Sequence, residues 1–119
     1  PAVCFTDPEM AEVGLNKEQA KEKGIEVATA QFPFAGNARA VSLDSPDGFV
    51  RLIYTKDEKN VVGAQIVGPG ASDMAGELSL IVNCGMNVED VDLTIHPHPT
   101  LNEPIQEAAD IAMGFPTHI

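Results

Sequence analysis

The chain has 119 residues, a length that suits one compact domain, and 44% are hydrophobic and 21% charged, as in an ordinary folded protein. Its net charge is −11, and every Lys and Arg lies before residue 60. So few cations argue against a nucleic-acid partner, and the sequence has no apolar run of about 20 residues, which a membrane span would need. The acidic second half would either attract a basic protein partner or form a solvated surface.

The two cysteines, Cys4 and Cys84, stand far apart and outside any CxxC pattern. Isolated thiols are typical of a reducing compartment rather than of a disulfide framework, so we expect a cytoplasmic protein. We also expect both side chains to be buried, because free cysteine behaves as a small hydrophobic residue.

The first third of the chain predicts a strand, a helix and a second strand. Residues 2–6 are apolar and β-prone, and the TDPE that follows reads as a turn. Asn16, with Gln19 three residues later, forms a capping box that opens a helix, and Gly24 ends it. A strand over residues 25–34 follows, and then a loop.

The most regular pattern lies between Gly48 and Val67. The string FVRLIYT alternates apolar and polar residues, KDEKN supplies a turn, and VVGAQIVG resumes the strand. This pattern predicts an antiparallel hairpin with one buried face. Within it, Arg51 should point outward, and Gly63 should mark a bulge or a close approach of two backbones.

The second half predicts helices over residues 72–83 and 104–113, with a short helical turn at 88–93 between them. The string GPGAS at residues 68–72 reads as a turn that leads into the first of these helices. We therefore expect an α+β domain in which an antiparallel sheet has helices packed on one side.

The string HPHPTLNE, at residues 96–103, is the best candidate for chemistry. Its two prolines hold the chain extended and a helix follows at once, so His98 lies on a rigid support. Glu103 follows five residues later, and a carboxylate that fixes the tautomer of a histidine makes a general acid–base pair.

A purely structural explanation of the same residues stays open. Thr100 and Glu103 have the spacing of a capping box, which would make Glu103 a helix-start residue. Pro104 is best suited to the first helical position, which would instead make Glu103 itself the cap.

These strings resemble the pyridine nucleotide–disulfide oxidoreductase family, and its dihydrolipoamide dehydrogenase branch most of all. HPHPTLNE resembles that branch's HAHPTLSE, PAVCFTDPEMAEVGL resembles the opening of the family's last domain, and VVGAQIVGPGASDM resembles a strand-to-helix segment. Leu101 favours the lipoamide branch over other disulfide reductases. The resemblance implies that residues 1–119 are one dimerisation domain, cut from a longer flavoenzyme.

The departures from the family pattern are small. Pro97 stands where Ala is common, and Pro104 follows Glu103 where Ala is frequent. Asn102 replaces Ser, and since Asn can cap a helix as well as Ser can, we expect the geometry to stay intact. The chain has no GxGxxG motif and no redox-active cysteine pair, so catalysis by this domain alone is not expected.

The resemblance implies a homodimer in which this loop enters the active site of the partner subunit. His98 would take a proton from a dihydrolipoamide thiol, and Glu103 would orient His98. The His98–Pro99 peptide bond would be cis, with its backbone beside the flavin. FAD and NAD would be bound by other domains, and a basic binding domain from the acyltransferase core of 2-oxoacid dehydrogenase complexes would be a partner.

Three alternatives remain from the residues themselves. His96 and His98 on an extended stretch would place both rings on one side, where His118 or Cys84 could complete a metal site, although no spacing supports a third ligand and we expect no metal. Pro1 could act through an N-terminal amine. The acidic half could form a freestanding interaction module, in which charge reversal at Asp90 or Asp92 would abolish binding.

Overall fold

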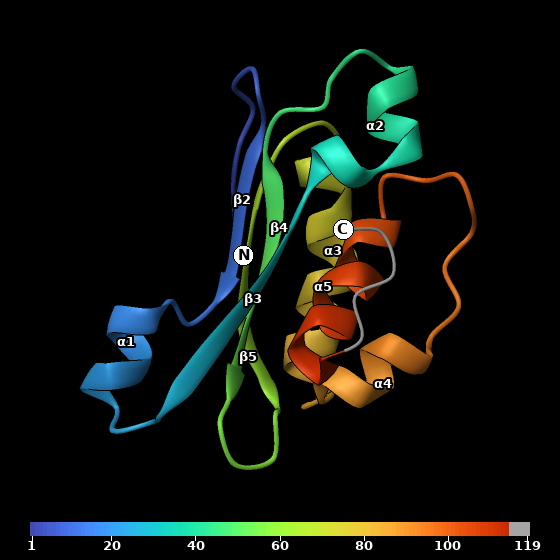
Figure 1. Cartoon of the computed structure of the whole chain (residues 1–119). Helices are drawn as coiled ribbons and strands as arrows, with labels where there is room; N and C mark the ends of the chain where they lie inside the picture. The colour runs from blue at the N-terminus through green and yellow to red at the C-terminus, as the bar shows by residue number, and fades with distance from the viewer. Residues whose placement is uncertain (115–119) are drawn as a thin grey trace.

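The computed structural model describes residues 1–114, which form a five-stranded antiparallel sheet in the order β1-β2-β5-β4-β3. The elements in chain order are β1 (Ala2–Cys4), β2 (Met10–Gly14), α1 (Lys17–Glu22), β3 (Val27–Pro33), the 3-10 helix η1 (Phe34–Gly36), α2 (Ala38–Ser42), β4 (Phe49–Thr55), β5 (Val61–Val67), α3 (Ala71–Asn83), α4 (Val88–Leu93) and α5 (Glu103–Met113). Figure 1 shows α3, α4 and α5 against one face of the sheet, and the short α1 on the opposite side. The predicted α+β architecture is confirmed.

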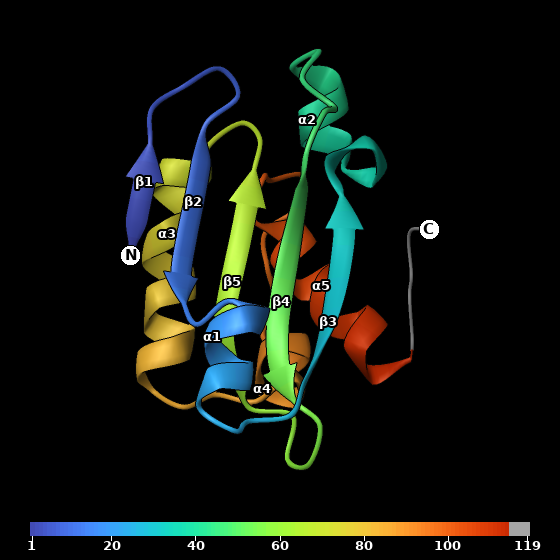
Figure 2. The same cartoon turned by 90° about the vertical axis from the view of Figure 1, so that its left-hand side faces the viewer.

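The predicted hairpin forms the centre of the sheet, where β4 and β5 pair antiparallel between β2 and β3 (Figure 2). Arg51 lies opposite Gln65 on one neighbouring strand and Gln31 on the other. Its guanidinium donates to the Oε1 atoms of both, at 2.6 Å to Gln65 and 2.8 Å to Gln31, and covers the ring of Phe49 at 4.6 Å. The outward direction predicted for Arg51 is therefore confirmed.

The hydrophobic core lies between the inner face of the sheet and the long helices α3 and α5. Its largest fully buried side chains come from both layers: Phe32, Phe34, Val50, Leu52, Ile66, Met74, Leu78 and Ile105. Burial of each such side chain contributes roughly 1.5–3 kcal/mol. This packing fixes the position of α3 and α5, and with them the loop that joins α4 to α5.

Gly63 lies where the hairpin passes against the segment that follows β2. The register of β4 with β5 shifts between Ile53 and Tyr54, and a Cβ atom on Gly63 would lie 1.8 Å from the carbonyl oxygen of Leu15. Both the predicted irregularity and the predicted close backbone approach are present. Only glycine fits this position.

Two features were not predicted. Residues Met10–Gly14 form β2, whose exposed and buried residues alternate, with Ala11 and Val13 in the core. The loop expected after β3 contains η1 and α2, and Asn37 caps α2 by accepting a hydrogen bond from the amide of Ala40 at 2.8 Å. Both segments are short, so their pattern is weak in the sequence and tertiary packing decides their structure.

The expected burial of the cysteines was wrong. Cys4 and Cys84 are both exposed. Cys4 lies on β1, the three-residue edge strand, and Cys84 follows the last residue of α3. In β1 only the middle residue, Val3, packs against the core, and Cys4 alternates to the other face. Within residues 1–114, no helix combines the length and the apolarity that a bilayer crossing requires.

Candidate functional site

The loop between α4 and α5, which carries His98, runs along the side of the helices that faces away from the sheet (Figure 1). Its side chain is 65% exposed, and the flanking prolines Pro97 and Pro99 are exposed as well. The His98–Pro99 peptide bond is cis. The loop therefore presents His98 on an outward edge of the domain.

The structure brings His98 and Glu103 together. Both carboxylate oxygens of Glu103 lie 2.9 Å from Nδ1 of His98, while the Glu103 side chain is 14% exposed. An ionised carboxylate accepts hydrogen bonds, so Nδ1 carries the proton and Nε2 of the neutral ring is left as a base that faces outward. This tautomer is the one that a general base requires.

Glu103 also holds the loop itself. Its Oε1 accepts a hydrogen bond from the backbone amide of Thr100 at 2.9 Å, which is half of the predicted capping box. The other half is missing, because α5 begins at Glu103 with Asn102 and not Thr100 at the N-cap, and the Thr100 hydroxyl donates to the carbonyl of Pro97 at 2.7 Å. One carboxylate thus fixes the loop backbone and the histidine ring at the same time.

Asn102 does not cap α5 through its side chain. Asn102 occupies the N-cap position with helical backbone angles, and its side chain makes no capping hydrogen bond. Its amide instead donates to Oε1 of Glu77, on α3, at 2.9 Å. The caps Asn16, Asn37 and Asn87 all have extended backbones, whereas the helical backbone of Asn102 does not place its side-chain oxygen to accept from the first turn.

Asn37, at the start of α2, connects this segment to the loop that carries His98. Its amide nitrogen donates to the carbonyl oxygen of Thr100 at 2.9 Å, and its side chain is buried. Asn37 also lines, with His98, Glu103 and Glu107, a cavity of about 110 Å³ beneath the histidine ring. No pattern of residues signals this contact beyond an Asn in an N-cap position.

His96 has partners of its own and does not face the same way as His98. Its Nε2 lies 2.6 Å from Oε2 of Glu77, and its side chain is 5% exposed. Its Nδ1 lies 2.9 Å from the carbonyl oxygen of Thr94 and 3.3 Å from Oε1 of Gln106. The expectation that both rings lie on one side was therefore wrong.

The metal alternative gains no support from this arrangement. Among residues 1–114, no group of three or more His, Cys, Asp or Glu side chains is placed to bind a metal ion. His118, the other ligand considered, lies outside the described residues.

The contact between Glu77 and His96 shifts their pKa values in opposite directions. Hydrogen bonding to Glu77 raises the pKa of His96 against the opposing effect of burial, and the charge of Glu77 adds to the rise. Burial acts to raise the pKa of Glu77, but hydrogen bonds from His96 and Asn102 and the charge of His96 together lower it. Glu77 was missed from the sequence; its one signal is an acidic residue in the middle of an apolar helix.

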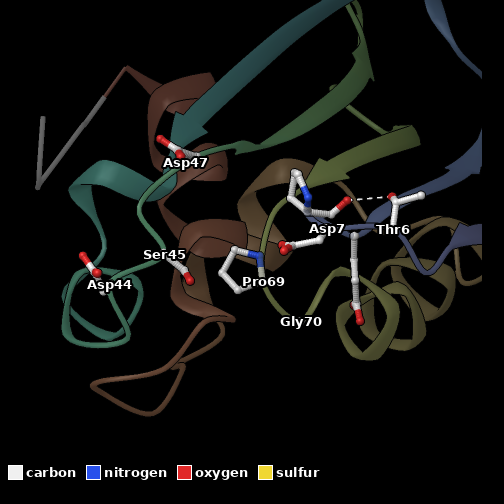
Figure 3. Close-up of a pocket in the computed structure, with 9 residues that line it drawn as sticks. Thr6, Asp7, Asp44, Ser45, Asp47, Pro69 and Gly70 are labelled. Atoms are coloured by element: carbon white, nitrogen blue, oxygen red, sulfur yellow. Dashed lines mark hydrogen bonds between the residues drawn. The ribbon is translucent and has the colours of Figure 1, made fainter.

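A second cavity, of about 530 Å³, lies between the β1–β2 connection and the end of α2 (Figure 3). Its charged side chains are all acidic: Asp7, Glu9, Asp44 and Asp47. The carboxylate of Glu9 already accepts hydrogen bonds from the amide and the hydroxyl of Ser72, at 3.0 Å and 2.7 Å. None of the predicted site residues lines this cavity.

Comparison with known proteins matches the whole domain. The family model described as the pyridine nucleotide-disulphide oxidoreductase dimerisation domain matches residues 1–109. Dihydrolipoyl dehydrogenases from Staphylococcus aureus and Geobacillus stearothermophilus are each 54% identical to the chain, over 99% and 100% of its length. The chain covers 25% of each of them, so it spans about a quarter of the length of the curated relatives it matches.

Solved structures show the same fold. LpdA from Mycobacterium tuberculosis aligns with a TM-score of 0.87 and 29% identity, over 94% of this chain and 24% of that chain. A NAD-dependent persulfide reductase from A. fulgidus aligns with a TM-score of 0.78 and 26% identity, over 95% of this chain and 22% of that chain.

Proposed function

Because the chain belongs to the dimerisation-domain family of the pyridine nucleotide-disulphide oxidoreductases, we propose that it is the interface domain of a dihydrolipoamide dehydrogenase. The 54% identity to dihydrolipoyl dehydrogenases favours this branch over other disulfide reductases. The full enzyme would oxidise dihydrolipoamide to lipoamide and reduce NAD, and this domain would supply the acid–base pair to the partner subunit.

The observation that carries this proposal is the pairing of His98 with Glu103. The carboxylate holds Nδ1 at 2.9 Å through both oxygens, and the ring is otherwise exposed. Nε2 is therefore free to accept a proton from a group outside this chain. The carboxylate stabilises the imidazolium that results, as a buried acid does in other histidine-based sites.

The proton transfer follows from thiol chemistry. His98 would take the proton from one thiol of dihydrolipoamide, and the thiolate would attack the enzyme disulfide on the partner subunit. One sulfur–sulfur bond forms between substrate and enzyme while the enzyme disulfide breaks and releases a thiolate. Attack by the second substrate thiolate then releases lipoamide and leaves the enzyme as a dithiol, two electrons richer.

The exposed loop is suited to contact a flavin from one side and does not itself form a pocket that encloses one. Pro97, His98 and Pro99 are all exposed, so they offer a rigid surface that another subunit could cover. The backbone of His98 and Pro99 would lie beside the partner's flavin. FAD and NAD, bound by domains outside this chain, would carry the electrons when present.

An apolar surface next to the loop supports the homodimer. Leu93 and Ile95 are 70% and 90% exposed, on either side of Thr94, and Leu80 on α3 is 60% exposed. Leu80, Thr94 and His96 line one hollow of about 240 Å³. Large exposed apolar side chains that adjoin each other mark an interface, and a second copy of this domain is the partner that we assign to them.

The acidic surface on α4 supports the proposed basic partner from the acyltransferase core. Glu89 and Asp90 lie exposed in its first turn, and Asp92 follows. Asp90 is a poor site for charge reversal, because its Oδ2 accepts from the amide of Asn87 at 3.1 Å and completes a capping box. Reversal at Glu89 and Asp92 tests docking without loss of the cap.

A cytoplasmic location is part of the same proposal.

The experiment is a His98→Gln variant of the full-length enzyme, with flavin content and dihydrolipoamide turnover measured side by side. Loss of a general base costs about 10²- to 10⁴-fold in turnover, and flavin should stay bound, since the side chain is exposed. Asp73→Asn, an exposed polar change on α3, is the control and should leave turnover unchanged. Turnover of His98→Gln equal to that of the control would end the assignment.

A further inference from the structure

Glu77, in the middle of α3, contacts both ends of the loop that carries His98. Its Oε2 lies 2.6 Å from Nε2 of His96, where the loop begins, and its Oε1 accepts from the amide of Asn102 at 2.9 Å, where the loop ends. The two oxygens of one carboxylate thus bridge two residues that enclose the whole HPT segment. The contact is partly shielded, with the Glu77 side chain 27% exposed.

We propose that Glu77 is a positioning residue, which fixes the position of His98 by hydrogen bonding to both ends of the loop. We call this contact of Glu77 with His96 and Asn102 the clasp. The inference rests on the proposed function, since the loop is the one that presents the base. Other contacts act inside the loop, where Thr100 bonds to Asn37 and Glu103. Glu77 differs from these because it fixes the two ends of the loop to the rigid core helix.

The hydrogen-bonding geometry shows that His96 takes part as an imidazolium. Nδ1 faces the carbonyl oxygen of Thr94, and Nε2 faces the carboxylate of Glu77, so both ring nitrogens face acceptors. The amide of Gln106 turns its oxygen to Nδ1, because its nitrogen donates to the carbonyl of Asp92 at 3.0 Å. A neutral imidazole has one N–H and cannot satisfy both sides, whereas the charged ring satisfies them.

The clasp is therefore a charge-assisted contact in a shielded place. Glu77 on α3 is the charged group that faces His96, while α5 contributes the Gln106 amide and the end of α4 contributes a backbone carbonyl. Hydrogen bonds between charged groups are about twice as strong as neutral ones. No Lys or Arg occurs after residue 59, so a histidine supplies the cation that this acidic half uses here.

Loss of the clasp should misplace His98 without removing it. Displacement of a catalytic group by about 1 Å can cost on the order of 10²-fold in rate. In the full-length flavoenzyme, Glu77→Gln should lower kcat by about 10- to 100-fold with little change in KM, because the base and not the substrate site is disturbed. Asp73→Asn removes the same charge one turn earlier on α3, from an exposed position, and is the matched control.

The 119-residue chain allows a second readout that does not depend on activity. Imidazole NMR titration should give His96 a pKa above its ordinary 6.5 in the wild-type chain and in Asp73→Asn, and a lower pKa in Glu77→Gln. Backbone order parameters for residues 97–101 should fall in Glu77→Gln alone. If Glu77→Gln does not fold, Asn102→Ala removes the other arm of the clasp and should also loosen the loop.

The possible results separate the two proposals. If Glu77→Gln keeps the kcat and the loop order of Asp73→Asn while His98→Gln is inactive, the clasp is refuted and the proposed function stands. If His98→Gln is fully active, the proposed function fails, and the titration and order parameters still decide whether Glu77 closes the loop.

Discussion

The side chain of Asn37 donates a hydrogen bond to the carbonyl oxygen of Thr100, 63 residues later in the chain, at 2.9 Å. At the same time its Oδ1 caps α2 by accepting from the amide of Ala40. One buried amide group thus links a short helix beyond the sheet to the loop that presents His98. Polar groups in such a place are costly to leave unpaired, so the contact constrains both segments.

Asn37→Ser tests this contact. Serine keeps a side-chain oxygen for the cap of α2 but has no donor that reaches Thr100. The carbonyl of Thr100, in this partly buried contact, loses its donor. An unsatisfied buried group costs about 1–3 kcal/mol, so we expect a loss toward the lower end of that range in the free energy of unfolding of the chain in urea.

Asn87→Ser is the matched control for that measurement. Asn87 caps α4 by accepting from the amide of Asp90 at 2.9 Å, within a local capping box near the surface. The same substitution at the same helix position should change the unfolding free energy by less than about 0.5 kcal/mol. Equal losses of unfolding free energy in the two variants would mean that the hydrogen bond from Asn37 to Thr100 does not stabilise the fold.

Glu103→Gln separates the proposed acid–base role of Glu103 from its structural one. The amide oxygen can still accept from Thr100 or His98, but it no longer carries the charge that stabilises an imidazolium. We expect kcat of the full-length enzyme to fall by about 10- to 100-fold, less than for His98→Gln, with a shifted pH profile.

Glu89→Gln, in the first turn of α4, is the control for Glu103→Gln because it removes an exposed acid from an equivalent helix position. It should leave both kcat and the pH profile unchanged. A Glu103→Gln profile that superimposes on the wild-type profile would reduce Glu103 to a residue that only supports the start of the helix.

Gly63→Ala should strongly destabilise the domain. The new Cβ would meet the Leu15 carbonyl oxygen at 1.8 Å, and neither backbone can move without breaking the sheet, so we expect a cost of about 3 kcal/mol or more. Gly76→Ala is the control, because Gly76 lies on the exposed side of α3 with nothing within 4 Å of a new Cβ. Helix propensity predicts that it stabilises by roughly 1 kcal/mol, and thermal unfolding should separate the two variants by many degrees.

The contact between His96 and Glu77 should make stability depend on pH in a defined window. The pKa of His96 is raised in the folded chain, so its contribution is complete below 6.5 and is lost as pH rises through the folded pKa. The pKa of Glu77 is lowered, so its contribution is complete above 4.5 and is lost as pH falls through the folded pKa. Both contributions are complete between pH 4.5 and 6.5.

The measurement is urea unfolding of the wild-type chain and of Glu77→Gln over a range of pH. The difference in unfolding free energy between wild type and Glu77→Gln should be largest between pH 4.5 and 6.5 and should become smaller at lower and at higher pH. The Asp73→Asn variant should differ from wild type by the same small amount across the window. A difference for Glu77→Gln that does not change with pH would contradict an ionised pair.

Elements whose signals are local could be predicted from the amino-acid sequence. The capping box of Asn16 and Gln19 is present with both of its hydrogen bonds, because its partners lie three residues apart in the chain. The hairpin from Gly48 to Val67 follows from strict alternation, which buries one face whatever lies around it. The pairing of His98 with Glu103 belongs here too, since a rigid proline loop leaves few ways to join them.

Contacts between distant segments depend on how the domain packs, and the sequence did not predict them. Asn102 has the residue type of a helix cap, yet its backbone is helical and its amide nitrogen donates to Glu77 on another helix. The ring of His96 hydrogen-bonds to the same Glu77 carboxylate and therefore does not lie on the same side as the ring of His98. The hydrogen bond of Asn37 with Thr100 arises from the packing of α5 on the sheet, which no pattern of neighbouring residues specifies.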